Sequence, residues 1–245
     1  GMCTELDGTM RATVAPMIGD LVLTEIMPSP DAILDDTVDP PVKVSDDDAE
    51  WIEIETFADF DLNGISLDRA NDSRDPDVVD SGSCLHVTAG SRIVFARSAD
   101  GAVNGMLGSV AGTFGFTMVG GSAASPGDVQ ILIDDLVLDS FTWTSAVATG
   151  ASLQLDPDFV TPGDNDMERF WCDGTTAYGL GDLGTPGQPN LECEILPPAG
   201  FCVGVDLIER PIVAPAAGQL VISEYLANPI GDDGDEEWFE ITNTG

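Results

Sequence analysis

Two glutamates stand in the middle of short runs that favour β-strands, and they are the acids best placed to meet across neighbouring strands. Glu25 lies in residues 21–27 (LVLTEIM), and Glu53 lies in residues 51–55 (WIEIE). Two carboxyl groups held close together raise the pKa of one of them, so such a pair can act as acid and base, as in glycosidases. The simpler alternatives are a solvent-facing pair or metal ligands. We favour these alternatives, because the sequence indicates no substrate cleft.

Acidic side chains also crowd the segment that precedes the second run. These residues are Asp31, Asp35, Asp36, Asp39, Asp46, Asp47, Asp48 and Glu50. Calcium prefers six to eight oxygen ligands from flexible, carboxylate-rich loops. We therefore expect calcium as a possible cofactor, with these candidate ligands: Asp46, Asp47, Asp48, Glu50 and Glu25. The alternative is a solvated loop whose acids keep the protein soluble.

Other motifs have weaker support. Residues 59–64 match the first six positions of an EF-hand loop, but the twelfth position is Ala70 instead of the bidentate glutamate. His86 is the single histidine, which excludes a multi-histidine zinc site. Neither G-x-S-x-G nor H-E-x-x-H occurs. We therefore expect no catalytic residues and no enzyme activity.

Five cysteines at wide, unequal spacings favour disulfides formed in an oxidising compartment, with one thiol left over. We predict that Cys84 pairs with Cys172 and that Cys193 pairs with Cys202. Cys3 is then free, and a lipid-anchored Cys3 is the alternative. The alternative is that some of these side chains are simply buried as small hydrophobes.

The composition excludes several classes of partner. The chain has 245 residues, 8 basic and 44 acidic side chains, and a formal net charge of −36. Nucleic acids and anionic membranes both require clusters of Lys and Arg, which this chain lacks. No run of 18 apolar residues occurs, so we expect no membrane insertion. A surface this rich in carboxylates tolerates salt, which fits a secreted or cell-surface protein.

Short runs of alternating or β-branched residues, bounded by Gly, Pro, Asp or Asn, recur along the chain, and no window shows helical periodicity. The clearest runs are residues 21–27, 51–55, 63–67, 91–97, 114–119, 129–134, 136–143 and 151–155. In the run 51–55, the period of two predicts that Trp51, Glu53 and Glu55 share a wet face. Residues 131–138 predict a hairpin that turns at Asp134 and Asp135. The fold class is therefore all-β, and a β-sandwich is expected.

An internal repeat shows how the chain is organised. Residues 19–27 (GDLVLTEIM) recur as residues 218–226 (GQLVISEYL), and residues 50–54 (EWIEI) recur as residues 237–241 (EWFEI). Self-similarity of this kind is typical of tandem modules. We expect an N-terminal extension at 1–18, a first module at 19–190, a linker at 191–217 and an incomplete second module at 218–245.

The strings LVLTEIMPSP, EWIEIE, DLNGISLD, SRIVFAR, LVLDSFTW, ASLQLD and GTPGQPN resemble the lamin tail domain family, over residues 19–190. The resemblance implies an immunoglobulin-like β-sandwich, and the acidic insert and cysteines point to its bacterial exported branch. That branch implies a non-catalytic binding, adhesion or spacer module of a larger exported protein, with a protein or glycan ligand at the cell surface. The alternatives are an accessory domain of a secreted hydrolase, or a glycan-binding module whose tryptophans are exposed.

The incomplete second module supplies only about two strands, and an isolated two-stranded unit is marginally stable in water. Its apolar side chains, including Trp238, need a partner surface, and its edges carry backbone groups that invite strand addition. We therefore expect it to pack against the first sandwich or to exchange strands with a neighbouring chain, giving self-association.

Overall fold

A computed structural model describes the whole chain except residues 32–33, 36–41, 44–46, 204–207, 228–236 and 245. The chain divides into two compact units, Gly1–Ile195 and Leu196–Gly245. The described residues form strands, turns and three 3-10 helices, and none of them is in an α-helix. The 3-10 helices are η1 (Asp47–Ala49), η2 (Pro157–Phe159) and η3 (Glu168–Phe170). Within the same residues, the search for a helix long and apolar enough to cross a membrane finds none.

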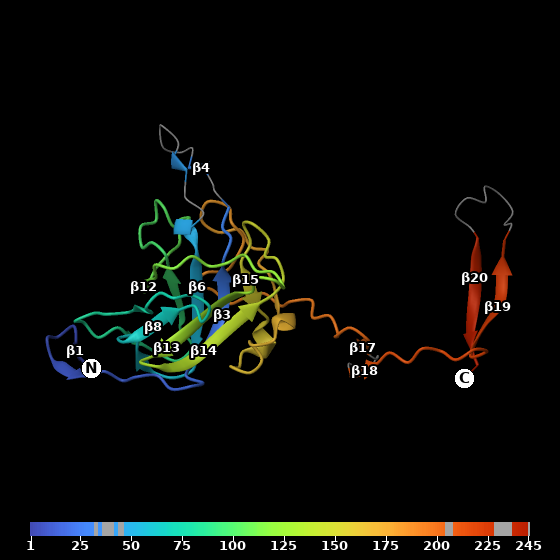
Figure 1. The fold of residues 1–245 in the computed structure, drawn as a ribbon, viewed down its shortest axis with the longest axis horizontal. Coiled ribbons are helices and arrows are strands. Elements are labelled where there is room, and N and C mark those ends of the chain that lie inside the picture. The colour runs from blue at the N-terminus through green and yellow to red at the C-terminus, as the bar shows by residue number, and fades with distance from the viewer. Residues whose placement is uncertain (32–33, 36–41, 44–46, 204–207, 228–236, 245) are drawn as a thin grey trace. The chain divides into compact units, whose positions relative to one another are not determined.

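The first unit is built on two sheets (Figure 1). The larger sheet has the order β12 (Gly112–Thr113), β11 (Arg92–Ala96), β6 (Trp51–Thr56), β3 (Leu21–Met27), β15 (Leu153–Leu155) and β16 (Trp171–Asp173). The smaller sheet has the order β14 (Leu136–Trp143), β13 (Gly127–Ile133), β8 (Ile65–Asp68) and β9 (Asp77–Val78). All neighbours are antiparallel except β11 and β12. The predicted all-β sandwich is confirmed.

Three short strand pairs complete the first unit. They are β1 (Met2–Thr4) with β2 (Met10–Ala12), β4 (Leu34–Asp35) with β5 (Val42–Lys43), and β7 (Phe60–Asp61) with β10 (His86–Val87). The N-terminal pair belongs to the body of the unit, since the Thr4 amide donates to the Gly82 carbonyl and the Cys84 amide donates to the Thr4 carbonyl.

The main apolar core lies between the two sheets, and the central strand β3 is buried along its whole length. The second face of β3 and β6 is covered as well, because Leu107, Val110 and Tyr178 pack against Met27 and Trp51. The predicted wet face of β6 is therefore wrong: Trp51 and Glu53 are fully buried. A period of two locates the two faces of a strand but does not reveal a loop layer that covers the polar one.

Two other local predictions had different outcomes. The hairpin at 131–138 is confirmed, with Asp134 in the left-handed region (φ 52°) that its tight turn requires. The run 114–119, in contrast, is not a strand. Its alternate residues Phe114, Phe116 and Met118 are buried in the core without joining a sheet. The alternation of apolar residues in 114–119 therefore comes from an extended loop that has one side buried in the core.

The disulfide pairing predicted from the sequence is wrong. Cys3 bonds to Cys84, Cys172 bonds to Cys193, and Cys202 is the free, exposed cysteine. The backbone pairing of β1 with residues 82–84 brings the first two cysteines together, so Cys3 is neither free nor available for lipidation. The number of bonds is as expected, and two disulfides fit an oxidising environment.

The described residues of the second unit form two antiparallel strand pairs. These pairs are β17 (Phe201–Val203) with β18 (Glu209–Pro211), and β19 (Leu220–Leu226) with β20 (Trp238–Asn243). The predicted linker at 191–217 therefore contains a hairpin of its own. Trp238 lies opposite Leu226 in the β19–β20 ladder and is 46% exposed. Packing of this hairpin on another surface, or strand exchange with a second chain, stays a prediction.

Candidate functional site

The candidate site lies at the centre of the larger sheet, where β3 and β6 pair. Their register shifts between Leu23 and Glu25, so Thr24 forms a bulge. Because of this extra residue, Glu25 lies directly opposite Glu53. The prediction that these two acids meet across neighbouring strands is confirmed, and both are fully buried.

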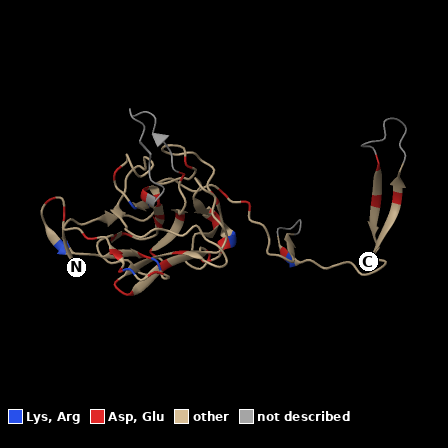
Figure 2. Cartoon of the chain, turned by 45° about the horizontal axis from the view of Figure 1, so that its top comes forward, with Lys and Arg blue, Asp and Glu red and all other residues tan. Residues whose placement is uncertain are grey.

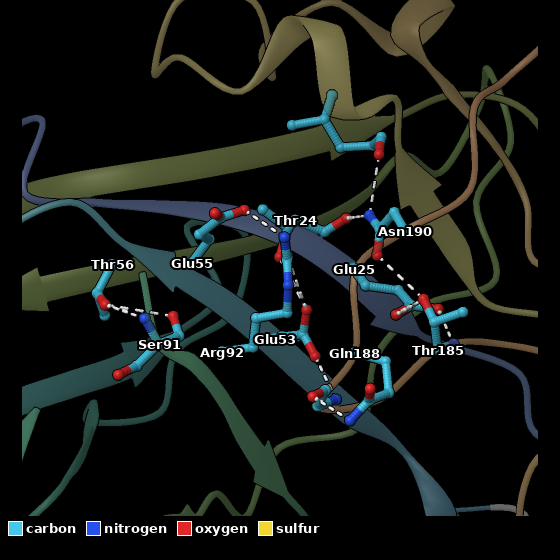
Figure 3. Close-up of polar contacts among 12 residues, drawn as sticks. Thr24, Glu25, Glu53, Glu55, Thr56, Ser91, Arg92, Thr185, Gln188 and Asn190 are labelled. Carbon is cyan, nitrogen blue, oxygen red and sulfur yellow. Dashed lines mark hydrogen bonds and ion pairs between the residues drawn. The ribbon is translucent and has the colours of Figure 1, made fainter. Parts of the chain in front are cut away.

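A second part of the site is the closing segment, residues 184–190, which lies over the two glutamates (Figure 3). The Thr185 amide donates to Glu25 Oε1 at 2.8 Å, and its hydroxyl donates to Oε2 at 3.0 Å. The Gly187 amide donates to Glu53 Oε2 at 2.6 Å. The backbone of a segment more than a hundred residues away thus supplies the donors that two buried carboxyl groups require.

Strand residues on both sides supply the remaining partners. The Ser152 hydroxyl, next to β15, donates to Glu25, and the Thr24 hydroxyl donates to Glu53 Oε1 at 3.2 Å. Arg92 of β11 places one guanidinium nitrogen 2.8 Å from Glu55 and another 3.6 Å from Glu53. Arg92 therefore brings a positive charge to the buried pair, and it shares that charge with Glu55.

The electrostatics of the pair follow from this burial. Burial, followed by the charge of Glu25, raises the pKa of Glu53 to about 8, against the Gly187 amide and Arg92, which favour ionisation. Burial also raises the pKa of Glu25, although three hydrogen bonds from Ser152 and Thr185 oppose the shift. Near neutral pH, Glu53 therefore carries a proton, and the two carboxyl groups do not repel each other as two full charges would.

Access to solvent decides what this pair can do chemically. A hollow of about 320 Å³ lies next to the site, lined by Arg92, Val94, Gly108, Ser109, Pro186, Gly187 and Gln188. Neither glutamate lines this hollow, and both have no exposed surface. A proton donor must reach its substrate, so in this structure the two acids act on the closing segment and hold it against the sheet.

Of the predicted calcium ligands that the structure describes, Glu25 and Glu50 take part in separate hydrogen-bond networks. Glu50 is buried and accepts the Met118 amide at 3.0 Å, with Arg97 at 3.7 Å, whereas Glu25 belongs to the network described above. Asp48 is partly exposed, and Asp46 and the side chain of Asp47 lie outside the described residues. Among the residues described, no group of three or more His, Cys, Asp or Glu side chains could hold a metal ion.

In the partial EF-hand motif, residues 59–64, the side chains of Asp61 and Asn63 form hydrogen bonds with other parts of the first unit. Asp61 accepts hydrogen bonds from two guanidinium nitrogens of Arg11, at 2.6 and 2.8 Å. These bonds lower the pKa of Asp61 to about 2. The Asn63 amide donates to the carbonyls of Ser81 and Ser83. The Arg11 contacts fasten the N-terminal hairpin to the sandwich, and the Asn63 contacts hold residues 81–83 against the motif.

The sequence pointed to Glu25 and Glu53 but not to Ser152, Thr185 or Gly187, which surround them. The signal available was the string GTPGQPN, whose prolines and glycines hold an irregular path and expose backbone amides. Another buried acid, Asp139, was missed by the sequence analysis. It accepts the Leu23 amide at 2.6 Å, and burial raises its pKa to about 7.

Comparison with known proteins adds no family assignment. No family profile matches the chain, and neither the curated proteins nor the solved structures contain a significant match.

Proposed function

We propose that this protein is a non-catalytic, exported β-sandwich module that binds a partner or spaces the parts of an extracellular protein. The observation that carries the proposal is the use made of Glu25 and Glu53. The acid pair that would suit catalysis has its oxygens engaged by residues 152, 185 and 187 and is sealed from solvent.

Export is supported by the two disulfides and by the charge. Both bonds lie in the first unit, and they close chain separations of 81 and 21 residues. Acidic side chains are spread over the strands and loops of both units, and basic ones are few (Figure 2). The resemblance to the exported branch of the lamin tail family supports the same localisation and an immunoglobulin-like arrangement of the strands.

A glycan-binding role through tryptophan stacking has less support. Trp51 and Trp143 are fully buried, and Trp171 is nearly so. Of the four tryptophans, Trp238 alone has a substantial exposed surface, so no exposed pair is available to stack on sugar rings.

Turnover assays on the full chain test the proposal. We expect no hydrolysis of polysaccharide, ester or phosphodiester panels by the wild type or by the Glu53→Gln variant. Hydrolysis by the wild type that is lost in Glu53→Gln would overturn the proposal, because it would assign the buried acid to chemistry. Glu192→Gln, at an exposed acid, is the matched control.

A further inference from the structure

The loop between β8 and β9 contains the tripeptide Asn71-Asp72-Ser73, which has the form N-x-S. The chain has seven asparagines, and Asn71 alone is followed two residues later by serine or threonine. In secreted proteins, N-x-S/T with any middle residue except proline is the acceptor sequence for N-linked glycans on surface loops. Because so short a sequence also occurs by chance, the contacts around Asn71 decide whether it can be used.

The β-turn that contains Asn71 is fixed by groups other than the Asn71 side chain. The Asp72 amide donates to the Arg69 carbonyl at 3.3 Å and closes the turn. The buried carboxylate of Asp128 accepts the Asn71 main-chain amide at 3.3 Å and an Arg69 guanidinium nitrogen at 3.4 Å. Arg69 also donates to the Thr117 carbonyl at 3.0 Å. The backbone at Asn71 is therefore held in place while its side chain takes no part.

The side chain of Asn71 is exposed, and it has no hydrogen-bond partner among the residues that the structure describes. The other asparagines of the first unit differ from it, because each donates its side-chain amide to an oxygen of the protein. These residues are Asn63, Asn104, Asn165 and Asn190. A glycan is attached to the side-chain nitrogen of asparagine, so Asn71 is the asparagine of this unit whose nitrogen is accessible and uncommitted.

Ser73 supplies the second element of the acceptor sequence. Its side chain is exposed as well and, within the described part of the chain, forms no hydrogen bond. The carboxylate of the middle residue, Asp72, accepts the Arg74 amide at 2.8 Å. Attachment of a glycan at Asn71 would therefore displace none of the contacts that hold the loop.

We propose that Asn71 is an N-glycosylation site of this protein. The donor is an oligosaccharide joined through a phosphate group to a polyprenyl lipid, and a membrane-bound transferase supplies the catalysis. The Asn71 side-chain nitrogen forms a bond to the anomeric carbon of the first sugar. The bond between that carbon and the phosphate oxygen breaks, the lipid phosphate leaves, and the nitrogen gives up one proton to a base of the transferase. The inference rests on the proposed export, because transfer of this kind takes place on the export pathway.

Mass spectrometry of the exported protein from its native cells tests the inference. Trypsin cuts after Arg69 and Arg74 and releases residues 70–74 (ANDSR), which contain Asn71 and no other asparagine. We expect this peptide to carry a glycan. Enzymatic removal of the glycan in heavy-oxygen water should then leave a labelled aspartate in place of Asn71.

Variants secreted by a host that glycosylates N-x-S/T sequences separate the roles of the two residues. Asn71→Gln should remove the glycan completely, and so should Ser73→Ala, although it keeps the asparagine. Ser73→Thr should retain the glycan because it keeps the hydroxyl, and so should Ser109→Ala, the matched control at an exposed serine outside the acceptor sequence. Made in a host without the transferase, all four variants should melt at the wild-type temperature, which separates loss of the glycan from loss of the fold.

Two results would overturn the inference. The first is an unmodified 70–74 peptide in protein that its native cells export, and the second is a glycan that persists in Asn71→Gln or in Ser73→Ala. Protein retained inside its native cells would instead contradict the proposed export, and an unmodified 70–74 peptide from the secreting host would then overturn the glycan site. Hydrolysis that is lost in Glu53→Gln would overturn the proposed function and leave the glycan in place. The glycan site and the proposed function therefore fail separately.

Discussion

The side-chain amide of Asn190 donates to the main-chain carbonyl of Thr24 at 2.7 Å, across a sequence separation of 166 residues. The same amide donates to the Leu155 carbonyl at 2.9 Å. Asn190 is the last residue of the closing segment, and Thr24 is the bulge residue that sets the two glutamates opposite each other. The side-chain amide of Asn190 therefore fastens the closing segment, residues 184–190, to the β-bulge at Thr24.

We expect Asn190→Leu to destabilise the protein by about 2–4 kcal/mol, because two buried carbonyls lose their donor. Urea denaturation of the variant and the wild type measures the change. Gln188→Leu, at an exposed residue of the same segment, should change stability by less than about 0.5 kcal/mol. Equal effects of the two substitutions would show that the segment is held in some other way.

A second substitution tests the fit of the cover on the sheet. In Gly184→Ala, the new Cβ would lie 2.8 Å from Glu25 Oε1 and 2.9 Å from the Ser152 hydroxyl, so the buried network must shift. We expect a loss of about 1–3 kcal/mol by thermal or urea denaturation. Gly163→Ala is the control, since nothing lies within 4 Å of its added Cβ.

The raised pKa of Glu53 predicts that stability falls as the pH rises through the neutral range. The folded state holds this proton up to a pH of about 8, whereas the unfolded chain releases it near the ordinary value of 4.5. The contribution is complete below that ordinary value and is lost as the pH rises through about 8, at no more than about 1.4 kcal/mol per pH unit.

Melting temperatures between about pH 5 and pH 8, in about 0.5 M salt to screen surface charges, measure this slope. Glu53→Gln should flatten it, because an amide does not titrate. Asp139, whose pKa is about 7, supplies a second contribution of the same sign, so some slope should persist. The exposed Glu192→Gln variant should keep the wild-type slope, and a flat wild-type profile would contradict the prediction.

How far the sequence predicts this site depends on the range of the interactions involved. The bounds of β3 and the turn at Asp134 follow from periodicity and turn chemistry, which are local. The neighbouring positions of Glu25 and Glu53 also follow, because both acids stand mid-strand. The closing segment that lies over the two glutamates could not be predicted, because Thr185 and Gly187 contact them across long sequence separations and through backbone amides.

The cysteines show the same limit. Spacing predicted two bonds and one free thiol, but four cysteines allow three connectivities whichever one is left out. The outcome was decided by β1 pairing beside Cys84 and by the Cys193 amide, which donates to Asp156 at 2.8 Å and holds this cysteine near β15 and β16.

Peptide mapping without reduction should recover the Cys3–Cys84 and Cys172–Cys193 pairs, with alkylation at Cys202 alone. By loop entropy, the first bond contributes about 4–5 kcal/mol and the second about 3 kcal/mol, so Cys3→Ser/Cys84→Ser should lower the melting temperature more than Cys172→Ser/Cys193→Ser. Recovery of Cys193–Cys202 would contradict this arrangement.

The calcium prediction for the acidic insert is tested by melting in about 5 mM calcium and in EDTA. A site of extracellular affinity should stabilise the protein by about 1–2 kcal/mol at that concentration. The double variant Asp46→Asn/Asp48→Asn should lose the shift. Identical melting curves for the wild type in calcium and in EDTA would contradict the calcium prediction.

The two disulfides also determine how the first unit responds to tension. A pull on the ends passes from Cys3 directly to Cys84, and from Cys172 directly to Cys193, so residues 4–83 and 173–192 carry no load. Only 88 residues (172 − 84) can be drawn out, compared with 190 (193 − 3) after reduction. The extensible length is thus about 300 Å instead of about 650 Å. Strands β3 and β6 both lie in the loop that the Cys3–Cys84 bond closes. Tension on the protein would therefore pass through this disulfide and would not pull the two central strands apart.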